Sequence, residues 1–192
     1  MKQIVILLTL FIFNACSLKE SPPIKVYTLT VEGIAPVSHS VHRNKTIKVS
    51  FPQTLKEKIS AKMNYSYSPS ERGVYQNSQW SNNSAKLIQG NIIQCLEHSQ
   101  IFRAVLPYES TAGEDYRLES SIFDFSHYVR GVASYAKVSI QLSLIDTYTG
   151  RLIKTKRFSY RENTKTTDAK GYVEATQRAM GRLSKDLVAW LR

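Results

Sequence analysis

Cysteine, acidic side chains, glycine and proline are all scarce in this sequence of 192 residues. Its two cysteines exclude a disulfide-stabilised scaffold. The 8 glycines and 6 prolines, against a hydrophobic share of 42%, exclude collagen-like and low-complexity disordered chains. Long apolar runs are missing too, since none reaches the roughly 20 residues that a membrane-spanning helix needs. The length therefore suits one domain with a sizeable core.

Recognisable catalytic motifs are also missing. The sequence has no His-Glu-x-x-His, no Gly-x-Ser-x-Gly, no P-loop and no Rossmann glycine pattern. His39 and His42 are the only histidines near each other, and we expect neither a metal site nor a catalytic site. We interpret His98 and His127 as structural. The one adjacent acidic pair, 114–115, is interpreted as a solvated turn.

The N-terminus has the pattern of a secretory signal. Lys2 precedes an apolar run at residues 4–13, and this run is too short to span a bilayer. The sequence Asn14-Ala15-Cys16-Ser17 follows and resembles a bacterial lipobox, with Phe13 and Asn14 in place of its usual residues. The alternative is a buried first helix or strand. We predict a signal peptide at 1–15, a lipidated tether at 16–23 and a folded domain at 24–192.

Cys16 is the predicted membrane anchor. It would carry a diacylglyceryl group and an N-acyl chain such as palmitate, and several acyl chains at about 0.8 kcal/mol per buried methylene hold a protein firmly on a bilayer. No other cofactor is expected. Ser17, in place of aspartate, resembles the sorting pattern for the outer membrane of a Gram-negative bacterium. With Cys16 acylated, Cys95 has no partner and is expected to be a small buried side chain.

Positive charge dominates, with 26 Lys and Arg against 15 Asp and Glu, a formal net charge of +11. Removal of the signal lowers it to +10, of which +7 lies in the last 42 residues. Export would remove nucleic acid as a partner. The remaining interpretations are a solvated face, a surface for anionic headgroups, or a surface for an acidic protein. Arg178, Arg182 and Lys185 are the candidate contact residues on this face.

Apolar periodicity predicts a sheet with two helices. Strands are expected at 24–31, 46–51, 63–67, 73–80, 102–106, 116–129, 136–144 and 151–160, with a bulge near Ile122 and Phe123 and a hairpin at 63–80. One helix follows N-cap residues at 81–83 and runs to about residue 98. The other follows Thr167 or Asp168 and runs past Leu187. The last three strands are expected to form an antiparallel meander, with a turn at 146–150. We predict an α+β, two-layer single domain whose largely antiparallel sheet carries two main helices on one face.

An ordered set of short segments resembles the ABC-type transport auxiliary lipoprotein family, the group that includes paraquat-inducible protein C. It comprises Cys16, Tyr27-Thr28-Leu29, Ile47-Lys48-Val49-Ser50-Phe51-Pro52, Tyr75-Gln76-Asn77-Ser78-Gln79-Trp80, Leu87-Ile88, Leu96, Ile101-Phe102-Arg103-Ala104-Val105, Tyr116-Arg117-Leu118, Asp146-Thr147-Tyr148-Thr149-Gly150 and Asp186-Leu187-Val188-Ala189-Trp190-Leu191. Residues 53–59 are more basic than the family pattern.

The resemblance implies a non-enzymatic lipoprotein of an intermembrane lipid transport system. An ABC transporter would energise the system, a protein with mammalian-cell-entry (MCE) domains would bridge the periplasm, and this lipoprotein would be the dock at the periplasmic face of the outer membrane. A homo-oligomer is compatible with this role. Trp80 is interpreted either as a packing residue or as a partner or lipid contact. The alternatives are a structural envelope lipoprotein that contacts peptidoglycan or another outer-membrane assembly, and an enzyme with an unrecognised site.

Overall fold

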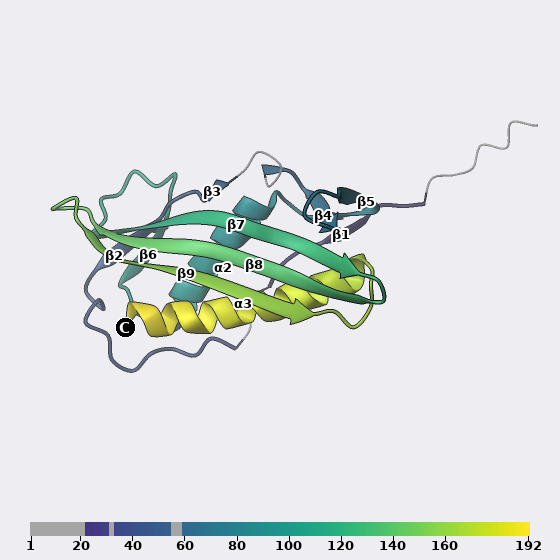
Figure 1. The fold of residues 1–192 in the computed structure, drawn as a ribbon. Helices are drawn as coiled ribbons and strands as arrows, with labels where there is room; N and C mark the ends of the chain where they lie inside the picture. Colours follow the sequence, from purple (N-terminus) through teal and green to yellow (C-terminus); the bar gives the residue numbers. More distant parts are fainter. Residues whose placement is uncertain (1–21, 31–32, 55–58) are drawn as a thin grey trace, which may run out of the picture.

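The computed structural model describes residues 22–30, 33–54 and 59–192, which form a sheet layer and a helix layer (Figure 1). The predicted signal segment and Cys16 lie outside these residues. The elements are β1 (Lys25–Tyr27), β2 (Thr46–Val49), β3 (Gln53–Thr54), β4 (Lys62–Ser66), β5 (Arg72–Trp80), α2 (Ser84–Ser99), β6 (Ala104–Pro107), β7 (Tyr116–Arg130), β8 (Ala133–Asp146), β9 (Leu152–Asn163) and α3 (Ala169–Leu191). The predicted α+β class is confirmed.

The longest strands, β7, β8 and β9, form the predicted antiparallel meander. Alternation in β8 places every second side chain in the core, namely Ala136, Val138, Ile140, Leu142 and Leu144. The predicted bulge is also confirmed, because the pairing of β7 with β8 shifts register between Ile122 and Asp124. Phe123 lies at this shift and is 48% exposed.

The other side of β7 pairs with several short strands that run parallel to it. β2, β3 and β4 follow one another along β7, β6 extends the sheet beside β2, and β5 and β1 extend it beside β4. β4 and β5 form the predicted hairpin. β1 ends at Tyr27, short of the predicted residue 31, because its partner β5 ends at Trp80. The sheet is therefore mixed, with its longest pairings antiparallel.

Both helices begin at side-chain caps. Asn83 accepts a hydrogen bond from the backbone N–H of Lys86 at the start of α2, and Asp168 accepts one from Gly171 at the start of α3. The helices share one core, where the Sγ of Cys95 lies 3.4 Å from the carbonyl oxygen of Ser184. Burial raises the pKa of Cys95 to about 11, so this thiol is a packing group, as predicted.

The helix layer covers one face of the sheet, and the opposite face of β7, β8 and β9 carries mainly polar and aromatic side chains. β7 and β8 are 15 and 14 residues long, which separates their ends by about 45–50 Å. Within the described residues, no helix is long and apolar enough to cross a membrane.

Candidate interaction surfaces

The three predicted contact residues of α3 lie together around a shallow hollow. Arg178, Arg182 and Lys185 are all exposed, and they border a cavity of about 400 Å³ with Glu162 of β9 and Thr30. Gly181 also lines it, and a Cβ there would meet no atom within 4 Å. The α3 hollow, as we call it, is therefore open above Gly181 and bordered by basic side chains.

Glu162 neutralises part of this basic rim. Its Oε1 lies 2.8 Å from Nη1 of Arg182, and its Oε2 lies 3.7 Å from Nε of Arg178. The hydrogen bond from Arg182 to Glu162 raises the pKa of that guanidinium. No carboxylate in the described part of the chain lies within ion-pair distance of Lys185. The hollow keeps a formal charge of +2, with Lys185 its least engaged cation.

Hydrogen bonds with the side chain of Gln177 attach the N-terminal segment of the domain, at Thr30, to the same helix. Gln177 of α3 accepts a hydrogen bond from the backbone N–H of Thr30 at 3.2 Å. Its Nε2 donates back to the carbonyl and hydroxyl oxygens of Thr30. These hydrogen bonds, which we call the Thr30–Gln177 clamp, set the position of this segment relative to the α3 hollow.

Trp80 is a core residue and does not contact a partner, which corrects one of the two interpretations above. Its side chain is 1% exposed, and its ring centroid lies 5.6 Å from those of Phe125 and Tyr172. The burial follows from its place at the end of β5, where the apolar side chains of β7 and α3 meet.

His127 lies in a buried stack of three rings. Its ring is nearly parallel to those of Tyr172 and Tyr75, at 5.2 and 6.1 Å between centroids. Its Nδ1 lies 2.7 Å from the hydroxyl of Tyr75, and its buried Nε2 has no hydrogen-bond partner among the described residues. Burial lowers the pKa of His127 to about 4, so the ring is neutral at pH 7.

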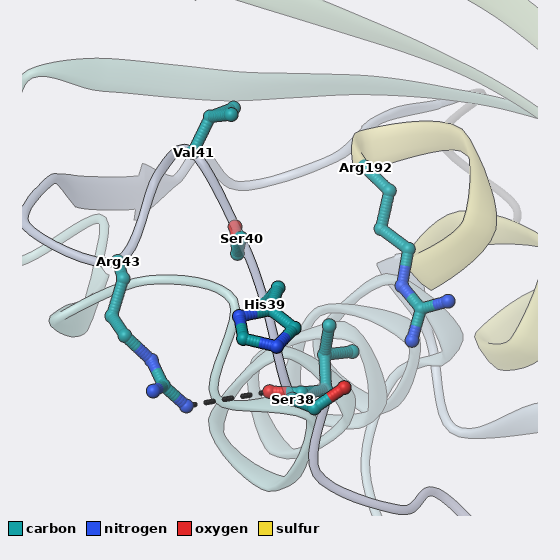
Figure 2. A pocket seen from close by; sticks show the side chains of 7 residues that line it. Ser38, His39, Ser40, Val41, Arg43 and Arg192 are labelled. Carbon is teal, nitrogen blue, oxygen red and sulfur yellow. Dashed lines mark hydrogen bonds between the residues drawn. The ribbon is translucent and has the colours of Figure 1, made fainter.

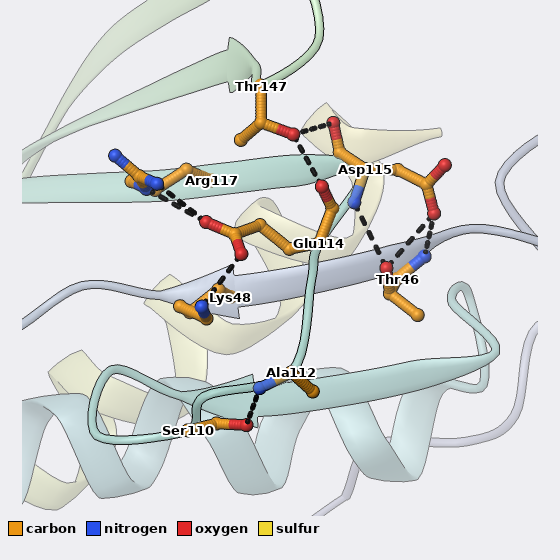
Figure 3. Close-up of polar contacts among 8 residues, drawn as sticks. All are labelled: Thr46, Lys48, Ser110, Ala112, Glu114, Asp115, Arg117 and Thr147. Atoms are coloured by element: carbon orange, nitrogen blue, oxygen red, sulfur yellow. Dashed lines mark hydrogen bonds and ion pairs between the residues drawn. The ribbon is translucent and has the colours of Figure 1, made fainter.

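The acidic pair at 114–115 is not a solvated turn. The side chain of Glu114 is only 7% exposed and lies 2.7 Å from Nζ of Lys48 and 2.6 Å from Nη2 of Arg117 (Figure 3). Asp115 accepts hydrogen bonds from the backbone N–H of Thr46 at 2.7 Å and from its hydroxyl at 3.0 Å.

These carboxylates join the loop before β7 to the start of β2. The hydrogen bonds from Lys48 and Arg117 lower the pKa of Glu114, and the backbone hydrogen bond from Thr46 is the main cause that lowers the pKa of Asp115 to about 2. We call this group the distal clamp, and it comprises Lys45, Thr46, Lys48, Glu114, Asp115 and Arg117.

A second open hollow, of about 540 Å³, lies between the loop at 37–43 and the end of α3 (Figure 2). Its rim includes His39, Arg43 and Arg192, and Arg43 donates a hydrogen bond to the carbonyl of Val37 at 3.3 Å. His42 packs elsewhere, against the rings of Phe102 and Tyr116. The two nearby histidines therefore do not converge. The described ranges contain no cluster of three or more His, Cys, Asp or Glu side chains arranged for a metal ion.

Comparisons with known proteins identify relatives of this fold and sequence. A family model described as "ABC-type transport auxiliary lipoprotein component" matches residues 27–188. A crystal structure of protein XCC0632 from Xanthomonas campestris is similar with a TM-score of 0.78 and 20% identity, covering 86% of this chain and 94% of that one.

Two further solved structures share the fold at lower similarity. An uncharacterised protein aligns with a TM-score of 0.66 and 12% identity over 88% of this chain and 99% of its own. The hypothetical protein CT253 from Chlamydia trachomatis aligns with a TM-score of 0.53 and 9% identity over 77% of this chain and 95% of its own. No curated protein matches this sequence.

Proposed function

We propose a function from the premise that this chain belongs to the ABC-type transport auxiliary lipoprotein family, whose model matches residues 27–188. The protein is a non-enzymatic lipoprotein at the periplasmic face of the outer membrane. It is the dock for an MCE-domain protein that carries lipid between the membranes of a Gram-negative envelope, driven by an ABC transporter.

The observation that carries this proposal is the family match, because it spans both layers of the domain from β1 to the last turns of α3. Acylation of Cys16 supplies the anchor. Pro22, the first described residue, is six positions after Cys16, and a chain of this length reaches at most about 20 Å. The domain is thus held next to the bilayer while its surface stays accessible to a periplasm-spanning partner.

The α3 hollow is the proposed contact for this partner. It has a net positive rim, an open floor at Gly181, and a fixed position relative to the tether through the Thr30–Gln177 clamp. We expect the segment of the partner that binds here to be acidic and to place a small side chain in the hollow. Charge complementarity of this kind speeds association and selects the partner.

Site-specific crosslinking in living cells tests the dock. Lys185→p-benzoylphenylalanine places a photo-crosslinker at the α3 hollow, and the same substitution at Lys86, an exposed lysine of α2 that pairs with Glu109 at 3.6 Å, is the matched control. We expect an MCE-domain protein to be crosslinked from position 185 and not from position 86. Crosslinks to peptidoglycan-associated proteins alone, in repeated trials, would support the structural envelope lipoprotein instead.

The anchor has a separate test. Mass spectrometry of the purified chain is expected to find residues 1–15 removed and three acyl chains on Cys16, and density-gradient separation is expected to find the protein with the outer membrane. A free Cys16 thiol contradicts anchoring, and an acylated protein in the inner membrane contradicts only the assigned membrane.

A further inference from the structure

The turn between β7 and β8 exposes an apolar tip. Only Gly131 and Val132 separate the two strands, and the positive φ of Gly131, 57°, is the backbone conformation that such a tight turn favours. Val132 is 101% exposed and therefore contacts almost nothing within the domain. A fully exposed valine at the tip of a long hairpin has no packing role in the fold.

Two stacked tyrosines lie directly behind this tip. Tyr128 and Tyr135 pair opposite each other in β7 and β8, and their rings are 5.2 Å apart and within 5° of parallel. Their neighbours His127 and Ala136 point into the core, so the tyrosines lie on the sheet face that the helices leave open. Aromatic rings with a polar hydroxyl are enriched where apolar and aqueous phases meet.

Cations surround the two rings. The Arg161 guanidinium carbon lies 3.7 Å from the Tyr135 centroid, and Arg130 and Lys137 lie 5.5 and 5.6 Å from the Tyr128 centroid. Asp124 pairs with Lys137 at 3.2 Å, whereas no carboxylate of the described residues lies within ion-pair distance of Arg130 or Arg161.

We call this group the hairpin patch, and it comprises Tyr128, Arg130, Val132, Tyr135, Lys137 and Arg161. Val132 forms the tip, Arg130 and the two tyrosine rings lie next to it, and Lys137 and Arg161 lie farther along the strands. An apolar tip backed by aromatic and cationic side chains matches the profile of a bilayer surface that contains anionic lipid.

The turn between β7 and β8, which carries the hairpin patch, lies at the end of the sheet where the chain enters the domain (Figure 1). β1 runs parallel to β5 with Lys25 beside Ser78, so the residues before β1 point toward the β4–β5 turn. Ser66, just before that turn, pairs with Tyr128. The described chain therefore begins at the end that carries the hairpin patch, six residues after Cys16.

We infer that the hairpin patch is a second membrane contact, with Val132 and the tyrosine rings in the bilayer interface and Arg130 and Arg161 at the phosphate groups of anionic lipid. The inference rests on the proposed anchoring by Cys16. The anchor makes the contact intramolecular, so a small patch that would not bind a membrane alone is sufficient. The contact also orients the domain, with β7 and β8 directed away from the bilayer.

Fluorescent labels at the two ends of β8 test this orientation. Full-length acylated protein carrying Val132→Cys is labelled with the fluorophore NBD and reconstituted in vesicles of phosphatidylethanolamine and phosphatidylglycerol. Tyr148→Cys is the matched control, since Tyr148 is 97% exposed in the turn at the other end of β8. Buried Cys95 and acylated Cys16 do not take the label.

We expect NBD at position 132 to shift to the blue and to be quenched by spin-labelled lipid, and NBD at position 148 to show neither effect. If the protein floats with the vesicles but quenching is equal at both positions, or absent at both, the inference is overturned and the proposed anchor stands. If the protein does not float, the anchor fails and the inference fails with it.

A charge variant identifies the lipid class. Arg161→Gln should lower the population of the contact about fivefold in vesicles with phosphatidylglycerol, the effect of one cation close to an anionic surface. Arg151→Gln, just before β9 and beside the far end of β8, should change nothing. If quenching at position 132 does not depend on phosphatidylglycerol, the assignment to anionic headgroups is wrong. If position 132 is protected only in the presence of an acidic protein, the membrane contact is wrong.

Discussion

The two ends of the β7–β8 ribbon carry cations in different states. At the distal clamp, Lys48 and Arg117 contact the nearly buried carboxylate of Glu114, and Lys45 contacts Asp115 at 3.1 Å. At the hairpin patch, the guanidinium of Arg161 contacts a tyrosine ring and has no carboxylate partner among the described residues.

The difference shows where the excess positive charge of this protein is available. Cations of the distal clamp stabilise the fold by joining β2 to β7, and their charge is largely cancelled locally. Ring contacts hold a guanidinium in place without cancelling its charge. A count of charges along the sequence therefore suggests more available positive charge at the distal clamp than the structure leaves there. The same count gives no indication of the available charge at the hairpin patch.

The largest predicted effect comes from removing a large side chain from the core. Trp80→Ala should lower the free energy of unfolding by about 3–5 kcal/mol, because a large cavity opens beside Phe125 and Tyr172. Urea denaturation measures it, with exposed Tyr148→Ala as the control, for which we expect less than about 0.5 kcal/mol. A small effect of Trp80→Ala would contradict its assignment to the core.

Acid should weaken the two ends in separate pH ranges. The pKa of buried His127 is lowered to about 4 in the folded state. Between about pH 6.5 and pH 4 the unfolded state therefore binds a proton that the folded state does not bind, and stability falls as the pH drops through this range. The pKa of Asp115 is lowered to about 2, so its contribution is complete above its unfolded pKa of 3.8 and is lost as the pH falls through 2.

Urea midpoints measured from pH 7 to pH 4 isolate the contribution of His127, because the contribution of Asp115 stays complete above its unfolded pKa of 3.8. His127→Gln should remove up to about 3 kcal/mol of the change between pH 6.5 and 4, compared with wild type. The exposed Val132→Ser removes no titratable group and should keep the wild-type slope. The lowered pKa of His42 leaves a smaller slope in His127→Gln. An unchanged slope in His127→Gln is incompatible with a buried neutral ring.

A smaller loss is expected at the distal clamp. Glu114→Gln leaves Lys48 and Arg117 facing a neutral amide, and we expect a loss of about 2 kcal/mol. Glu119→Gln is the control, since Glu119 is exposed on β7, the strand that follows Glu114. If the two variants lose the same free energy of unfolding, the distal clamp contributes no more than a surface ion pair. The contrast drawn between the two ends of the ribbon is then wrong for the distal end.

The smallest effect on stability belongs to the hairpin tip. Val132→Ser removes an apolar group that is already exposed, and the free energy of unfolding should change by less than about 0.5 kcal/mol. The same variant, labelled with NBD at position 133 through Ala133→Cys, should lose most of its quenching by spin-labelled lipid. Retained quenching would assign the membrane contact to the tyrosines and cations alone.

Local patterns in the sequence predicted the elements that depend on neighbours along the chain. The alternation in β8, the bulge at Ile122, the caps at Asn83 and Asp168 and the turn at 146–150 all follow from residues within a few positions of one another. The exposed basic face of α3 with Arg178 and Arg182 was predictable for the same reason.

Pairings between distant residues were not predictable in this way. The interpretation of 114–115 as a solvated turn was wrong because Lys48 lies in β2, which reaches β7 only through parallel pairing. The partner interpretation of Trp80 was wrong because Phe125 and Tyr172 come from other elements. The hairpin patch had no sequence signal, since Arg161 and Tyr135 meet only through the register of β8 and β9.

The sequence by itself determined the α+β class, the meander, both helices and the family of this protein, because these follow from periodicity, capping and an ordered set of local motifs. Only the tertiary structure decided which charges are cancelled and which stay available. Cancellation needs a carboxylate within a few ångströms, and sheet register alone brings Glu114 to Lys48 and Arg161 to the ring of Tyr135.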